Sequence, residues 1–198
     1  LQQRVLGREN PHTLTTMNNL ASALCHAGEH REAVTVLREC LEVRQRVLGR
    51  EHPHTLNTMT ILALALDDAG EHREAASVGR ECLEVRQRVL GRENPNTLFT
   101  MNNLALALNS AGEHREAVSV GRECLEARQR VLGKEHPNTL ATMYNLASAL
   151  DDAGEHREAV SVGRECLEVR QRVLGSEHPS TLATMYNLAS ALRNAGEH

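Results

Sequence analysis

Large aromatic residues are almost missing from this sequence. Its 198 residues contain no Trp, one Phe and two Tyr. Because 40% of the residues are hydrophobic, the chain has enough apolar material for a globular core, which Leu, Ala, Val and Met must supply. The three aromatic residues, Phe99, Tyr144 and Tyr186, are few enough that their positions need a reason of their own.

The sequence also lacks a basic cluster and a long apolar run. The formal net charge is −4, and the Arg residues alternate with Glu, so no positive field attracts a phosphate backbone. No run of about 18 apolar residues occurs, and residues 1–8 do not have the pattern of a signal peptide. We therefore expect no nucleic acid partner, no membrane partner and a cytoplasmic location.

No catalytic or metal-binding motif is evident. The 11 His and 5 Cys do not have the clustered spacing of a zinc site, either at His52 and His54 or at the turn residues His30, His72, His114 and His156. There is no phosphate-binding glycine loop and no Ser, His and Asp constellation that stands out from the rest of the sequence. The sequence predicts no cofactor, no metal and no enzyme activity.

A 42-residue period organises the whole chain. The period is marked by Pro11, Pro53, Pro95, Pro137 and Pro179, and by Gly28, Gly70, Gly112, Gly154 and Gly196. Cys40, Cys82, Cys124 and Cys166 follow the same period, and we expect them to be small, reduced core residues. The chain is thus four and a half copies of one unit.

Each unit predicts two helices. Residues 13–27 carry apolar side chains three and four positions apart, as one helix face requires, and Gly28 ends this first helix, called helix A. The second helix, called helix B, is expected over residues 30–48, with Gly49 at its end. A single hairpin of this kind cannot bury both apolar faces, so the copies must stack into a solenoid.

We expect one domain over residues 1–198. It comprises the end of a truncated helix B and a connector at 1–10, repeats at 11–52, 53–94, 95–136 and 137–178, and a half repeat at 179–198.

The pattern resembles the tetratricopeptide repeat, in the 42-residue variety with a long helix B that kinesin light chains contain. The resemblance rests on Met17-Asn-Asn-Leu20-Ala21-Ser-Ala-Leu24, on Ala33, Leu37 and Cys40, and on the connector Leu48-Gly49-Arg50-Glu51-His52-Pro53. It implies an all-α, right-handed superhelical solenoid of antiparallel helix hairpins that binds proteins or peptides without catalysis. One departure is Gly79, Gly121 and Gly163 at the large helix-B position that Leu37 occupies, and we expect these glycines to permit a close helix approach.

The copies of helix A differ from one another at six positions. Spaced by roughly 100° per residue, these positions fall in an arc of about 120°, here called the helix-A stripe. Its members are Thr15, Asn18, Asn19, Ser22, Cys25, His26; Asn57, Thr60, Ile61, Leu64, Asp67, Asp68; Phe99, Asn102, Asn103, Leu106, Asn109, Ser110; Ala141, Tyr144, Asn145, Ser148, Asp151, Asp152; Ala183, Tyr186, Asn187, Ser190, Arg193 and Asn194. In the family that the pattern resembles, this stripe lines the concave, ligand-binding surface.

Two observations favour a recognition surface over a drifting solvent face. The charged positions of helix B, expected to be exposed, repeat without change, as at Arg31, Glu32, Arg38 and Arg44, whereas neutral drift would alter both faces. All three aromatic residues lie in the stripe, where they suit interface anchors.

The expected partner is a protein or peptide, polar or basic in character, because Asp67, Asp68, Asp151 and Asp152 add negative charge to the stripe. The alternative function is that of a structural spacer or self-association segment in a larger signalling ATPase. The chain would then be a fragment whose exposed end faces stack against one another, so end-to-end self-association is also expected.

Overall fold

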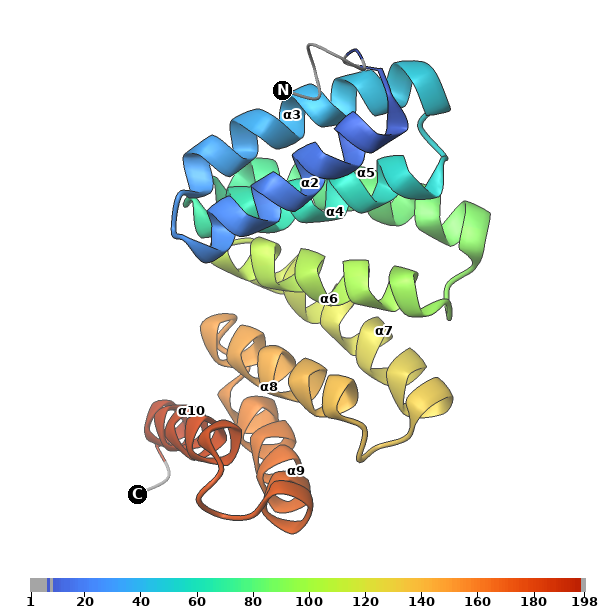
Figure 1. The fold of residues 1–198 in the computed structure, drawn as a ribbon. Helices are drawn as coiled ribbons and strands as arrows, with labels where there is room; N and C mark the ends of the chain where they lie inside the picture. Colours follow the sequence, from blue (N-terminus) through green and yellow to red (C-terminus); the bar gives the residue numbers. More distant parts are fainter. Residues whose placement is uncertain (1–6, 8, 197–198) are drawn as a thin grey trace. The chain divides into compact units, whose positions relative to one another are not determined.

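In the computed structural model, which describes residues 7 and 9–196, the described chain is helical and contains no strand (Figure 1). The helices are α2 (Pro11–His26), α3 (His30–Leu48), α4 (Pro53–Asp68), α5 (His72–Leu90), α6 (Pro95–Ser110), α7 (His114–Leu132), α8 (Pro137–Asp152), α9 (His156–Leu174) and α10 (Pro179–Ala195). The even-numbered helices are copies of helix A and the odd-numbered ones are copies of helix B. The truncated helix B expected at the start of the chain falls largely on residues 1–6 and 8, outside the described residues.

The helices form two compact units, residues 1–92 and residues 93–198. In the first unit, α2, α3, α4 and α5 pack each against the next, and the two helices A, α2 and α4, are also in contact. In the second unit, α6 to α10 repeat this arrangement, with α8 touching both α6 and α10. Each unit is therefore a stack of helical hairpins, and the predicted all-α helical repeat solenoid is confirmed. None of the described helices has the length and apolar character needed to cross a membrane.

Local sequence signals set the helix ends. The residue before each repeat proline is the N-cap; the side chain of Asn10, for example, accepts a hydrogen bond from the backbone N–H of His12 at 2.9 Å. The proline itself occupies the first turn, where its missing N–H is harmless. Helix A therefore begins at Pro11, two residues before its apolar span, and ends at His26, whereas helix B has the predicted bounds. Gly28, with φ of 81°, supplies the turn between them.

The core repeats with the same period. In the first repeat, Leu14 and Met17 of α2 pack with Cys40 of α3, and in the fourth Leu140 and Met143 of α8 pack with Cys166 of α9. Cys40, Cys82, Cys124 and Cys166 are all buried and free, as predicted. Because these side chains are small or flexible, the helices pack closely without the aromatic residues that the sequence lacks.

The helix-B glycines permit a close approach between repeats in the second unit. A Cβ atom added to Gly121 of α7 would lie 3.2 Å from Cδ1 of Leu146 in α8. The same atom added to Gly163 of α9 would lie 3.3 Å from Cδ1 of Leu188 in α10. The predicted close approach is therefore confirmed at these two positions.

Candidate functional site

The helix-A stripe lies mostly at the surface in both units. On α2 and α4 of the first unit, its members are exposed or half-buried, apart from the buried Thr60. On α6, α8 and α10 of the second unit, only Asn102 is buried. Of the three aromatic residues, Phe99 is 46% exposed and Tyr186 is 78% exposed, whereas Tyr144 is half-buried.

Stripe residues of neighbouring repeats contact one another in the second unit. Asn109 of α6 donates a hydrogen bond from Nδ2 to Oδ2 of Asp152 in α8, at 2.7 Å. Asn194 of α10 donates from Nδ2 to both carboxylate oxygens of Asp151, at 3.2 and 3.0 Å. The stripe of this unit is thus a connected surface across three helices A.

One position of the stripe belongs to the packing between helices. Asn18 accepts hydrogen bonds at Oδ1 from Cys40 Sγ at 3.6 Å and from Thr58 Oγ1 at 3.3 Å, and Thr60 lies 3.6 Å from Cys82 Sγ. In the third repeat, Asn102 Oδ1 accepts from Thr142 Oγ1 of the next helix A at 3.0 Å. Asn18, Thr60 and Asn102 therefore connect one repeat to another or helix A to helix B.

Tyr144 occupies this same position in the fourth repeat. Its ring packs against the Leu140, Met143, Cys166 and Val169 cluster. The guanidinium carbon of Arg170, in α9, lies 5.2 Å from the ring centroid, which is the geometry of a cation–π interaction. All three aromatic residues were expected to be exposed; for Tyr144 this was wrong, because α9 covers part of its ring, whereas its role as an anchor stays a prediction.

The repeated arginine at Arg44, Arg86, Arg128 and Arg170 is buried, so its expected exposure was wrong. Arg128 Nη1 donates to the carbonyl oxygen of Asn138 at 2.6 Å and to Thr142 Oγ1 at 2.7 Å, and Nη2 donates to the carbonyl oxygen of Leu98 at 3.3 Å. Burial lowers the pKa of the Arg128 guanidinium from its ordinary value. The arginine links helix A of its own repeat to helix A of the next one, which explains its presence in every copy.

The sequence contains a signal for this hydrogen-bond network. In every copy, the arginine is followed fourteen residues later by a threonine. Thr58, Thr142 and Thr184 each lie 2.7 Å from the arginine of the preceding helix B. Both partners repeat without change, and a polar pair that does not vary is typical of a buried contact.

Several other helix-B arginines form ion pairs between repeats. Arg38 Nη2 lies 2.8 Å from the carboxylate of Glu74 and 3.5 Å from that of Glu71. Arg122 makes the corresponding pairs at 2.8 Å with Glu155 and Glu158, which raise the pKa of its guanidinium. Constant helix-B charges such as Arg38 and Arg122 thus have structural partners, which give a structural reason for their constancy and weaken the comparison with the stripe.

Acidic and polar stripe residues at the end of helix A contact the side chain of the first residue of the following helix B. Asp67 lies 2.6 Å from Nδ1 of His72, Asp151 lies 2.7 Å from that of His156, and Asn109 lies 2.8 Å from that of His114. In the first repeat this position holds Cys25, where burial, with a smaller contribution from the charge of Asp68, raises the pKa of the thiol. Among the described residues, no three His, Cys, Asp or Glu side chains gather as a metal site would require.

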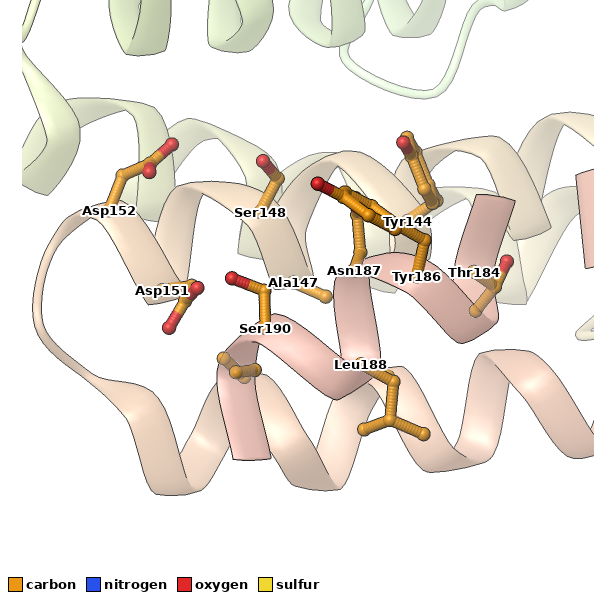
Figure 2. A pocket seen from close by; sticks show the side chains of 13 residues that line it. Tyr144, Ala147, Ser148, Asp151, Asp152, Thr184, Tyr186, Asn187, Leu188 and Ser190 are labelled. Carbon is orange, nitrogen blue, oxygen red and sulfur yellow. The ribbon is translucent and has the colours of Figure 1, made fainter. Parts of the chain in front are cut away.

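A cavity of about 130 Å³ opens on the stripe of the second unit. Stripe residues supply much of its lining: Tyr144, Ser148, Asp151 and Asp152 from α8, and Tyr186, Asn187 and Ser190 from α10. Figure 2 shows the two aspartates at one end and the two tyrosines at the other, with the two serines between them. Ala159 and Gly163 of α9 also line the cavity.

A tetratricopeptide repeat profile matches residues 1–46, 12–88, 79–130 and 108–172, and these matches together extend over most of the chain. The chain belongs to the tetratricopeptide repeat family. This family of non-enzymatic helical repeats forms scaffolds for protein interactions. No curated protein sequence matches the chain.

Solved structures of tetratricopeptide-like arrays are similar over almost the whole chain. The crystal structure of nearly identical TPR-like repeats from Podosopora anserina, described as those of a kinesin light chain, shares 30% identity with a TM-score of 0.84, covering 96% of this chain and 90% of that one. Its Q17M variant gives 30% identity and a TM-score of 0.85, covering 93% and 87%. This tetratricopeptide array is therefore of the kinesin light chain type. BtubC (BKLC) from P. vanneervenii, at 22% identity and a TM-score of 0.80 over 99% of this chain and 80% of that one, shares the fold.

Proposed function

We propose that this tetratricopeptide array is a peptide-binding scaffold whose ligand lies along the helix-A stripe. The observation that carries the proposal is the cavity of the second unit, because side chains of two successive helices A line it together. The cavity is lined by residues that differ between otherwise similar copies. It is therefore specific to this place in the array and does not follow from the shared repeat sequence.

The proposed contact surface is narrower than the whole stripe. Asn18, Thr60 and Asn102 are engaged in packing between helices, so they are left out of it. The exposed members carry the proposal, including Phe99 and Tyr186, whose large apolar area suits a peptide anchor. The variation of the stripe residues between copies still supports a recognition surface. The constant, paired charges of helix B no longer serve as a neutral comparison for that variation.

The ligand class follows from the charges on the surface. Asp68 and Asp152 are exposed carboxylates on the stripe, which favour a polar or basic peptide over an acidic one. Several helix-B arginines are already paired with glutamates of neighbouring segments, which lowers the positive potential that nucleic acid would require.

The test is a peptide-display selection on the whole chain, counter-selected against a stripe variant. Ser148→Leu, Asp152→Ser and Tyr186→Asn replace three stripe residues by those of the third repeat, so the helices should tolerate them. The control variant carries Ser119→Thr and Ser161→Thr. Both changes lie at an exposed helix-B position, and they introduce the threonine that the first repeat has there.

We expect enrichment of a motif that the control variant retains and the stripe variant loses, with equal helicity by circular dichroism. A motif retained by both variants, or no motif at all, would contradict binding at the stripe.

Self-association is the second candidate, and a specific surface favours it. Leu182 and Met185 of α10 are exposed, although the equivalent Leu140 and Met143 of α8 are buried in the cluster with residues of α9. A second copy could cover this apolar face. Sedimentation velocity should then show concentration-dependent association that Met185→Lys removes, and a monomer at all concentrations would exclude this candidate.

A further inference from the structure

The cavity of the second unit combines two kinds of group that recognise a cation. Tyr144 and Tyr186 present aromatic rings at one end, and Asp151 and Asp152 present carboxylates at the other (Figure 2). Ring faces attract a cation through their quadrupole, and carboxylates accept short, charge-assisted hydrogen bonds from guanidinium or ammonium groups. We propose that this cavity holds the side chain of an arginine or lysine of the bound peptide, an inference that rests on the proposed function.

Within the protein, a guanidinium group already packs against a tyrosine at this stripe position. Arg170 already lies over Tyr144, with its guanidinium carbon 5.2 Å from the ring centroid. Tyr186 has the same place in the next repeat, and no cation from the described residues lies over its exposed ring.

The two carboxylates differ in how much hydrogen-bonding capacity remains. Asp151 already accepts from Asn194 and contacts His156. Asp152 is exposed and, among the described residues, accepts a hydrogen bond from Asn109 alone, through Oδ2, so its Oδ1 can accept a hydrogen bond from the ligand. Asp152 is accordingly the main acceptor. Arg193 of α10 is an exposed cation at the stripe position that Asp151 occupies on α8, and its charge opposes that of the two aspartates.

Two serines keep the cavity open. Ser148 and Ser190 stand at a stripe position that Leu64 and Leu106 occupy in the second and third repeats. A leucine at residue 148 would fill space that the serine leaves, and the serine hydroxyls can accept hydrogen bonds from the ligand. At about 130 Å³ the cavity suits one side chain rather than a drug-sized ligand, whose sites have volumes of about 300–1,000 Å³.

The chain offers an intrinsic probe for this cavity. Its only two tyrosines both line the cavity, and it contains no tryptophan, so tyrosine fluorescence excited in the native protein reports on the cavity alone. The ligands are N-acetylarginine methylamide, its neutral citrulline counterpart, and the peptide acetyl-Gly-Ser-Arg-Ser-Gly-amide. None of them contains a fluorescent side chain.

We expect saturable fluorescence changes with both arginine compounds, with the peptide binding more tightly, and none with citrulline. Ser148→Leu should weaken binding at least about tenfold while keeping both tyrosines and the helicity, because it fills the cavity with a side chain that other repeats carry. The matched control is Ser22→Leu, the same change at the same stripe position of α2, which should leave binding unchanged.

Equal binding of citrulline, or unchanged binding by Ser148→Leu, would overturn the inference. Binding of the arginine derivative as tightly as the peptide would also overturn it, since the site would then take a free small cation rather than a peptide side chain. If the display selection yields a stripe-dependent motif without a basic residue and the arginine probes do not bind, the cation site is wrong while the peptide-binding scaffold stands.

Discussion

The buried arginines Arg44, Arg128 and Arg170 donate hydrogen bonds to carbonyl and hydroxyl oxygens of the following helix A. Burial of a charge is costly unless each of its donors finds an acceptor. Removal of the arginine also leaves those acceptors without a donor. The position therefore couples adjacent repeats more strongly than the exposed ion pairs do.

Two matched substitutions on α7 test this difference. Arg128→Met should lower the free energy of unfolding by about 2 kcal/mol, because buried oxygens lose their donors. Arg122→Met should lower it by less than about 1 kcal/mol, because the ion pairs with Glu155 and Glu158 are solvent-exposed and screened.

Urea denaturation of both variants at low and high salt measures the two effects, and only that of Arg122→Met should shrink as salt increases. Equal losses for both variants would show that the buried arginine has no special role.

The buried thiols predict a loss of stability at alkaline pH. Burial raises the pKa of Cys40, Cys124 and Cys166 above the ordinary value for a thiol. A group whose pKa is higher in the folded chain binds its proton more tightly there, so its contribution is intact below the unfolded pKa of about 8.5 and is lost as the pH rises above it.

We expect the urea midpoint to stay nearly constant below about pH 8.5 and to fall as the pH rises above that value. The fall should be smaller in a variant with alanine at these three cysteines. A midpoint that falls equally in both proteins would assign the effect to other groups.

At the scale of the helix, a glycine within helix B has two opposing effects: it lowers the helix propensity and it permits closer packing of the next repeat. A Cβ at Gly121 would lie 3.2 Å from Cδ1 of Leu146, the far end of a flexible side chain. The first repeat carries the larger, fully buried Leu37 at this position. The neighbouring leucine can therefore move aside.

Gly121→Ala should accordingly stabilise the protein by up to about 1 kcal/mol, because alanine is the better helix former. Gly133→Ala, at a residue with φ of 87°, should destabilise it instead. Thermal unfolding of both variants measures the signs, and a destabilising Gly121→Ala would show that Leu146 cannot move.

At the scale of the whole molecule, the single domain expected from the sequence stays a prediction. The 42-residue period continues through residues 92 and 93 without a change in the sequence pattern, although the helices group into two compact units there. Repeats of equal sequence have nearly equal stability, which favours cooperative unfolding of the array.

Both tyrosines lie in the second unit, so tyrosine fluorescence follows that unit, whereas far-ultraviolet circular dichroism follows all helices. We expect the two unfolding curves to coincide in urea. A fluorescence transition displaced from the circular dichroism transition would show that residues 93–198 unfold separately.

The sequence alone determined the features that depend on near neighbours in the chain. Apolar spacing, the repeated proline and the turn glycine predict the helices and the 42-residue hairpin, because helix formation and capping involve residues within a few positions of one another. The sequence also located the stripe, since its six positions follow from the helical period.

Only the tertiary structure decided what each stripe residue does. Asn102 joins the network of the buried Arg128, Tyr144 is partly covered by α9, and Ser148 and Ser190 line a cavity, because each depends on what a neighbouring helix brings opposite it. Arg44 and Arg38 are likewise two arginines of one helix with the same chemistry, yet the first is buried and the second exposed. Only the packing of the next repeat separates them, and that packing joins Arg44 to a residue 14 positions later and Arg38 to one 36 positions later, beyond the few positions over which helix formation acts.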